Sequence, residues 1–180
     1  LYYLKQSGFA EEAVGIDIFE DTEKPELYKR VDRFIFGNIE QQVFPEYDKY
    51  FDLILLPDVL EHLFEPQKIL RQLGNYLKAD GRIIVSMPNI RHYSALKRIF
   101  LQGDFKYEES GIFDYTHVRF YCRRNMCDLL RDSDYTIVKQ ESSIVNYKGK
   151  SMSKVLNRIT FGAFEEFFSY QYFFIAKKNT

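Results

Sequence analysis

The sequence predicts an α/β domain with a mostly parallel central sheet, helices on both faces and an antiparallel last strand. Two observations favour this class. Short continuous apolar runs, typical of strands buried on both faces, alternate with segments of helical periodicity. Near the C-terminus, two strand-like runs are separated by a helical, aromatic stretch, so they can pair antiparallel at one edge of the sheet.

Four apolar runs define the expected parallel strands, which cover residues 13–18, 33–37, 51–57 and 82–87. Between the last two, the segment 65–81 places its apolar residues on one helical face, with Pro66 in the first turn and Gly81 after the helix end. Further helices are expected over residues 22–31 and 91–103. Strands that alternate with helices in this way imply right-handed crossovers and a parallel sheet.

The C-terminal part departs from this alternation. We expect a helix over 125–134, a strand over 135–145, a helical stretch over 151–168 and a last strand over 170–178. The chain contains no internal repeat, low-complexity tract or linker. We therefore expect residues 1–180 to form a single domain.

Composition narrows the classes of partner and compartment. The 180 residues carry 25 basic and 26 acidic side chains, so charge gives no reason to expect nucleic acid as a partner. Two cysteines, Cys122 and Cys127, lack the further ligands that a zinc site needs, and are expected to be reduced thiols of a cytoplasmic protein. Elsewhere, too, we see no metal-ligand spacing. No apolar run approaches the roughly 20 residues of a transmembrane segment.

Two polar residues follow the first two strands. Asp17 ends the first, and a carboxylate there matches the vicinal hydroxyls of a nucleoside ribose. A solvated acid at a strand end is the simpler interpretation, and folds that bind NAD use an acid at the same place. Asn38 follows Gly37 after the second strand, where its amide can meet an adenine ring, although a Gly-Asn turn explains the pair equally well.

The motif "LPDVLEH" follows the central strand, at the kind of strand end where open α/β sheets bind ligands. Leu56 and Pro57 can present backbone to a ligand, and Asp58 is expected to cap the short helix that follows. His62 can take a proton from a reacting hydroxyl. A histidine that only fixes the local backbone is the alternative, and the one we slightly favour.

The motif "GIFDYTHVRFY" brings Asp114, His117 and Arg119 into six residues. Strand-like alternation predicts that His117 and Arg119 share one face. Asp114 can orient the imidazole of His117 and make it a better base, and Arg119 can bind a phosphate or carboxylate of a substrate. A structural Asp–Arg pair that braces the loop is the alternative.

Basic residues precede or interleave the aromatic stretch 151–174, and together they permit weak contact with an anionic membrane surface. The aromatic residues themselves have three interpretations. Packing of a terminal helix and strand into the core is the simplest. A lid over a site and the face of a homodimer remain open.

From Asp17 onward, the order of these motifs resembles class I S-adenosylmethionine-dependent methyltransferases. The segment from Phe51 to Asn89 is similar to bacterial small-molecule and sugar-pathway members, and "GIFDYTHVRFY" resembles a subgroup linked with cell-surface polysaccharides. The resemblance implies a Rossmann-like methyltransferase fold with S-adenosylmethionine as cofactor and S-adenosylhomocysteine as product. By the same resemblance, the cofactor-binding residues are Asp17, Ile18, Asn38, Ile39, Leu56, Pro57 and Asp58.

The resemblance also implies an activity, which is methyl transfer to an oxygen or nitrogen of a small molecule, such as a sugar or polysaccharide precursor. His117 and His62 are then the candidate catalytic residues, and Asp114 and Arg119 the candidate substrate-binding residues. The family's glycine-rich strand and loop should precede "LYYLKQSG", and we expect this chain to lack them. A non-catalytic scaffold of the same fold and an NAD-dependent Rossmann enzyme are the alternatives.

Overall fold

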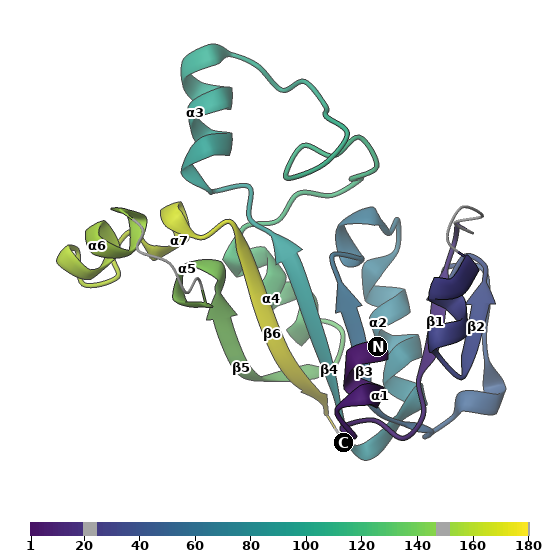
Figure 1. Ribbon diagram of the computed structural model, residues 1–180. Helices are drawn as coiled ribbons and strands as arrows, with labels where there is room; N and C mark the ends of the chain where they lie inside the picture. The colour runs from purple at the N-terminus through teal and green to yellow at the C-terminus, as the bar shows by residue number, and fades with distance from the viewer. Residues whose placement is uncertain (20–24, 147–151, 180) are drawn as a thin grey trace. The chain divides into compact units, whose positions relative to one another are not determined.

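A computed structural model describes residues 1–19, 25–146 and 152–179 of the chain (Figure 1). It divides into two units, residues 1–45 and residues 46–180, and each is described by itself. Two residues that begin expected helices lie outside the described residues. They are Thr22, for the helix expected over 22–31, and Ser151, for the helical stretch expected over 151–168.

The first unit is built on two parallel strands. Helix α1 (Tyr2–Gln6) is followed by β1 (Val14–Asp17), the 3-10 helix η1 (Pro25–Arg30) and β2 (Arg33–Phe36). Strands β1 and β2 pair in register, with Asp17 opposite Phe36, so their carboxyl ends lie at the same edge. Both strands are therefore confirmed to within one residue at each end.

The second unit contains a four-stranded mixed sheet in the order β3-β4-β6-β5. Its strands are β3 (Phe51–Pro57), β4 (Leu77–Pro88), β5 (Tyr135–Ser142) and β6 (Gln171–Lys178). Strand β4 pairs parallel with β3, whereas β6 pairs antiparallel with both β4 and β5. Three strands thus run in one direction and the last runs against them, which confirms the predicted antiparallel last strand (Figure 1).

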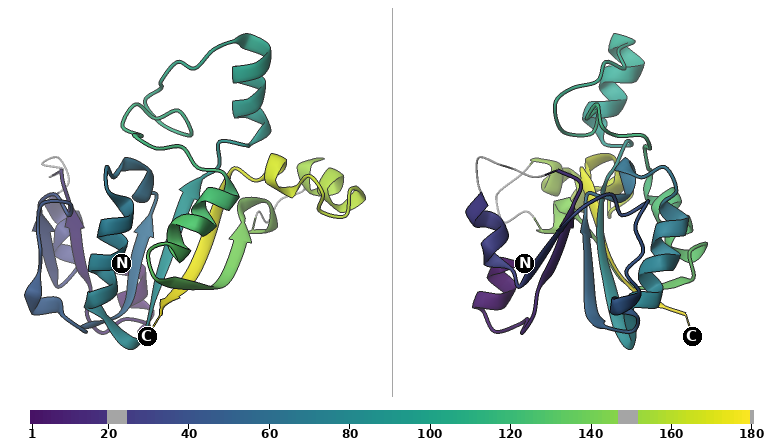
Figure 2. Two further views of the ribbon diagram at one scale, coloured as in Figure 1. Left: turned by 180° about the vertical axis from the view of Figure 1, so that it is seen from behind. Right: turned by 90° about the vertical axis from the view of Figure 1, so that its right-hand side faces the viewer.

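Two amphipathic helices, α2 (Pro66–Tyr76) and α4 (Arg123–Arg131), cover one face of this sheet (Figure 2, left). Helix α2 begins at a proline, which suits a first turn because that turn needs no amide donor. The two helices bury apolar side chains against the sheet, namely Ile69, Leu70, Leu73, Met126, Leu129 and Leu130. The core of this unit lies between these helices and the strands.

Helix α2 ends at Tyr76, four residues before the end we expected from the sequence. The backbone amides of Lys49 and Tyr50 donate to the carbonyls of Asn75 and Tyr76 at 2.9 Å each, which satisfies carbonyls that a longer helix would use. Leu77 instead pairs with Phe51 and starts β4. The apolar periodicity through residue 77 was therefore a poor guide to where the helix stops.

Each of the remaining helices lies between two strands along the chain. They are η2 (Pro45–Tyr47), η3 (Leu60–His62), α3 (Tyr93–Gln102), α5 (Ser143–Asn146), α6 (Met152–Ile159) and α7 (Glu165–Phe168). Two expectations were wrong here. The strand expected over 135–145 ends at Ser142, where α5 begins, and the helical stretch expected over 151–168 breaks between α6 and α7 at two residues with positive φ, Phe161 and Gly162.

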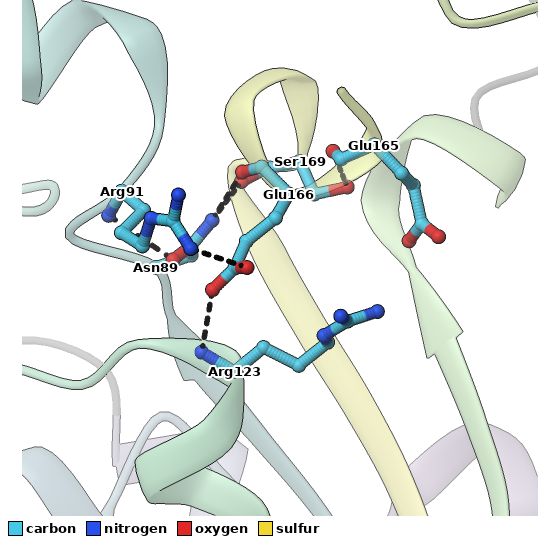
Figure 3. A network of polar contacts seen from close by, with 6 residues as sticks. All are labelled: Asn89, Arg91, Arg123, Glu165, Glu166 and Ser169. Atoms are coloured by element: carbon cyan, nitrogen blue, oxygen red, sulfur yellow. Dashed lines mark hydrogen bonds and ion pairs between the residues drawn. The ribbon is translucent and has the colours of Figure 1, made fainter. Parts of the chain in front are cut away.

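A polar network fastens α7 to the end of β4 (Figure 3). The fully buried Asn89 donates from Nδ2 to the backbone carbonyls of Glu166 and Ser169, both at 2.7 Å. The Glu166 carboxylate accepts from Arg91 Nη1 at 2.8 Å and from the backbone amide of Arg123 at 3.2 Å. One acidic side chain thus joins the segment after β4, helix α7 and the start of α4.

Candidate active site

The chain turns sharply where β3 ends, at Asp58. This residue has a φ of 51°, a left-handed conformation that aspartate tolerates better than most residues. Its amide donates to the carbonyl and the hydroxyl of Ser86, both at 3.1 Å. Its Oδ1 accepts from Ser86 Oγ at 2.9 Å and from Gln171 Nε2. Asp58 therefore links the ends of β3, β4 and β6.

The sequence predicted that Asp58 would cap the short helix after β3, and this is wrong. The cap position of η3 is Val59, and no side chain bonds to the free amides there. The Asp58 carboxylate is held by Ser86 and Gln171 instead, because the left-handed turn directs it toward the neighbouring strands. Neither partner was singled out from the sequence, where each is an ordinary polar residue of an apolar strand.

His62 is oriented through Thr116. Its Nδ1 lies 3.2 Å from the carbonyl oxygen of Thr116 and 3.0 Å from the hydroxyl. A carbonyl only accepts, so Nδ1 carries a proton, and in the neutral ring Nε2 then has the lone pair. Asp114 completes the arrangement, since its Oδ1 accepts from the Thr116 hydroxyl at 2.6 Å and from the Thr116 amide at 2.8 Å. These bonds, with the hydroxyl contributing most, hold the pKa of Asp114 below its usual range.

His117 is buried and lies against His62. Its Nδ1 donates to the carbonyl of Ile112 at 3.1 Å, which again leaves Nε2 with a free lone pair. The two imidazole rings meet edge to face, with 4.7 Å between centroids. Burial lowers the pKa of His117. The sequence prediction that Asp114 orients His117 is therefore corrected: Asp114 acts on Thr116, and through it on His62.

Glu61 is the residue that sequence reasoning passed over. It is fully buried, and neither carboxylate oxygen has a hydrogen-bond partner among the residues that the structure describes. Burial raises the pKa of this carboxyl to about 8. Its backbone carbonyl accepts from the amides of Val118 and Arg119 at 3.0 and 3.1 Å, which ties η3 to the loop that carries His117. The sequence shows only an acid next to a histidine after a central strand, and neither the burial of the acid nor its lack of a partner is visible there.

Arg119 braces the same loop. Its Nε donates to the carbonyl of Leu63 at 3.1 Å, and Nη2 donates to the carbonyl of Phe64. The side chain is exposed, whereas His117 is buried, so the shared face predicted from strand-like alternation is not present. The structure brings Asp58, His62, Asp114 and His117 close to Glu61 and attaches Arg119 to the segment beside it.

The first unit places Asp17 and Asn38 beside each other at the carboxyl ends of β1 and β2. The amide of Gly37 donates to the Asp17 carbonyl at 2.8 Å. The Asp17 carboxylate accepts from the amide of Phe19 through Oδ1, at 3.1 Å, and Asn38 Oδ1 accepts from the amide of Glu40 at 2.8 Å. These bonds form local turns that fix both side chains.

These two side chains fit the adenosine part of S-adenosylmethionine. Asp17 keeps Oδ2, and Asn38 keeps Nδ2, without a hydrogen bond to any residue in the described ranges. The first is an acceptor suited to ribose hydroxyls, and the second is a donor suited to an adenine ring nitrogen. Ile18 is exposed and Ile39 half-buried beside them. In the second unit, Leu56 is buried and Pro57 is exposed at the end of β3.

Over the described residues, no helix has the length and apolar character needed to cross a membrane.

The model of the methyltransferase domain family matches residues 1–140 of the chain. Among solved structures, a SAM-dependent methyltransferase from Archaeoglobus fulgidus is 21% identical, with a TM-score of 0.65, and the alignment covers 98% of this chain and 79% of that one. A S-adenosylmethionine-dependent methyltransferase from Mesorhizobium loti is 13% identical, with a TM-score of 0.64 and coverage of 98% and 85%.

A third solved structure is the 1,6-didemethyltoxoflavin-N1-methyltransferase of Burkholderia thailandensis, bound to 1,6-didemethyltoxoflavin and S-adenosylhomocysteine. It is 16% identical, with a TM-score of 0.60 and coverage of 99% of this chain and 65% of that one. No curated protein sequence gives a significant match. The family model covers most of the chain, and the α/β Rossmann-like fold is the one that these structures share. The chain therefore belongs to the methyltransferase domain family.

Proposed function

We propose that this protein transfers the methyl group of S-adenosylmethionine to an oxygen or nitrogen of a small molecule, with sugars and cell-surface polysaccharide precursors as the acceptor class. One observation carries the proposal. Two imidazoles beyond the end of β3 are locked by their Nδ1 bonds and keep Nε2 free to accept a proton. The sulfonium is an activated donor, so the main tasks of the protein are alignment and removal of that proton.

On the cofactor side, we propose that Asp17 and Ile18 hold the ribose, and that Asn38 and Ile39 hold the adenine. The free acceptor of Asp17 and the free donor of Asn38 support this assignment. The methionine part of the cofactor is assigned to the end of β3, at Leu56, Pro57 and Asp58. The left-handed turn at Asp58 supports it, because such a turn exposes backbone at a strand end where α/β folds bind ligands.

On the acceptor side, we propose His117 as the main catalytic residue and His62 as its neighbour. The lowered pKa of the buried His117 keeps it neutral and ready to accept a proton. Asp114 and Arg119, on the same loop as His117, are proposed to bind the acceptor. The bound heterocycle of the Burkholderia relative supports a small molecule as acceptor and nitrogen as one of the two acceptor atoms.

The cofactor is tested by calorimetric titration of S-adenosylhomocysteine into the protein expressed from its complete gene. Asp17→Ala should weaken binding by about 1.5–3 kcal/mol, the range for a hydrogen bond to a charged group. Glu11→Ala, which removes an exposed acid near the other end of β1, should leave binding unchanged. A wild-type protein that binds neither this ligand nor S-adenosylmethionine would be a non-catalytic scaffold. An NAD-dependent reaction is disfavoured by the antiparallel β6.

The acceptor chemistry is tested by turnover, followed as formation of S-adenosylhomocysteine in the presence of sugar nucleotides and polysaccharide precursors. His117→Ala should reduce turnover by about 10²- to 10⁴-fold, the usual value of general-base catalysis, with cofactor affinity nearly intact. His62→Ala is the matched comparison. If His117→Ala keeps full turnover while His62→Ala does not, the roles are reversed, and if both keep it, neither imidazole acts on the proton.

A further inference from the structure

Three potential metal ligands converge beyond the end of β3. Glu61, His62 and His117 each offer one ligand atom, and these atoms all lie within 4.8 Å of one another. Glu61 and His62 are adjacent in η3, whereas His117 comes from the loop between α3 and α4. The backbone bonds from Val118 and Arg119 to the Glu61 carbonyl hold the two segments together.

Both imidazoles already have the form that a metal ion requires. A metal-bound histidine usually donates its other ring nitrogen to a carbonyl, carboxylate or hydroxyl, which fixes the tautomer and the ring orientation. His62 makes such a bond to Thr116, and Thr116 is fixed in turn by Asp114. His117 makes it to the Ile112 carbonyl. The outer partners of a metal site are therefore present on both rings before any ion is considered.

The carboxylate of Glu61 lacks the partner that its burial demands. A buried acid without hydrogen bonds is costly unless it is protonated or meets a cation. Arg119, whose backbone amide donates to the Glu61 carbonyl, directs its Nε and Nη2 to the carbonyls of Leu63 and Phe64. Asp58 and Asp114 add negative charge around Glu61. The surroundings of the two imidazole nitrogens therefore attract a cation.

We infer that Glu61, His62 and His117 bind a divalent transition-metal ion. Two imidazole nitrogens and one carboxylate oxygen form a donor set that suits Zn²⁺ and its neighbours better than Mg²⁺ or Ca²⁺. In tetrahedral Zn²⁺ sites with bonds of about 2.0–2.1 Å, the ligand atoms lie about 3.4 Å from one another. The three ligand atoms of this cluster lie within 4.8 Å of one another, so each pair must approach by at most about 1.4 Å. Glu61 binds as the carboxylate, and any proton that it carries is released to solvent.

Three protein ligands leave at least one coordination position open, which is typical of catalytic rather than structural zinc. An acceptor hydroxyl bound there would release its proton to solvent more easily, so the imidazoles would act on it through the ion and not directly. This last step rests on the proposed methyl transfer, whereas binding of the ion does not. The two are therefore tested by separate measurements.

Binding is tested with the metal ion alone. The protein expressed from its complete gene is freed of metal with a chelator and titrated with Zn²⁺ by calorimetry, and with Co²⁺ as a visible-absorption probe of the donor set. We expect one ion per chain. Glu61→Gln and His117→Ala should each weaken binding by more than the roughly 10- to 100-fold that loss of an outer partner costs, and Thr116→Ala should fall within that range.

The control is His92→Ala, which removes the one other histidine of the sequence, a residue that caps the start of α3. It should leave stoichiometry and affinity unchanged. His62→Ala gives a second ligand test in case a substitution at a buried position prevents folding, which circular dichroism reports. The inference is overturned if the wild type binds no ion. It is also overturned if the variants Glu61→Gln, His62→Ala and His117→Ala all bind the ion as tightly as the wild type does. Loss of metal binding with retained S-adenosylhomocysteine binding would leave the proposed cofactor intact.

Discussion

At the residue scale, the hydroxyl of Ser86 supports the turn at Asp58 from both sides. It donates to the carboxylate at 2.9 Å and accepts from the amide at 3.1 Å. Ser86→Ala should lower the free energy of unfolding by about 1.5–3 kcal/mol, the range for a hydrogen bond to a charged group. Urea denaturation measures this. Thr136→Ala, which deletes an exposed hydroxyl bonded to Asn179, should change the free energy of unfolding by less than about 0.5 kcal/mol.

The hydroxyl of Tyr135 anchors β5 to α2, since it donates to the carbonyl of Leu70 at 2.8 Å in the core. Tyr135→Phe should lower the free energy of unfolding, measured by denaturant titration, by about 0.5–1.5 kcal/mol. Tyr121→Phe is the matched comparison, because its buried hydroxyl has no partner among the described residues. Tyr121→Phe should leave the free energy of unfolding unchanged or raise it slightly. An equal loss in both variants would show that the bond to Leu70 contributes nothing.

Residue chemistry was only partly predictable from the sequence. Asp17 and Asn38 could be placed at strand ends, because apolar runs mark the ends of buried strands. The importance of Glu61 could not be foreseen, since its isolation depends on which neighbours the fold brings near it. The same holds for the proposed metal ligands. His117 lies on a segment distant in sequence from Glu61 and His62, so no local spacing indicated the cluster.

At the element scale, the end of α3 depends on one aspartate. Gly103 ends the helix in the left-handed conformation, and Asp104 accepts from Arg98 Nε and from the amide of Lys106, both at 2.9 Å. The bond from the Lys106 amide and then the pairing with Arg98 hold the pKa of Asp104 below its usual range.

A lowered pKa in the folded state stabilises the fold above the pKa of the unfolded chain, and this contribution is lost as the pH falls through the folded value. Asp104→Asn should therefore be less stable than the wild type at neutral pH, and the difference should vanish in strong acid. Thermal unfolding over a pH series measures it. Asp52→Asn, whose carboxylate accepts from Lys78 Nζ at 2.7 Å, is the comparison. A difference that persisted in acid would contradict the assignment.

Element positions were more predictable than element ends. Strand β3 was predicted without error, and α2 began at Pro66 as expected. The end of α2 was set by Lys49 and Tyr50, and that of β5 by the start of α5, and neither partner is visible from local periodicity. Turns and pairing partners compete with propensity at such places, and they decide the boundary.

At the scale of the whole molecule, cofactor binding should appear as stability. A ligand that binds only the folded state stabilises it by about 2.7 kcal/mol at 100 times its dissociation constant. S-adenosylhomocysteine should therefore raise the melting temperature of the protein expressed from its complete gene. The Asp17→Ala variant should need a higher concentration of this ligand for the same rise in melting temperature, in proportion to its larger dissociation constant. The Glu11→Ala variant should follow the wild type. A melting temperature independent of this ligand would contradict the proposed cofactor role.

The strand order has a consequence for how the chain is made. Strand β6 lies between β4 and β5, although it is the last of the strands along the sequence. A ribosome adds about 5–20 residues per second, so about 4–16 s separate the emergence of β4 from that of β6. Throughout this interval β4 has an unpaired edge, which is a template for aggregation. The speed of translation across residues 89–170 therefore sets how long this edge stays unpaired in the nascent chain.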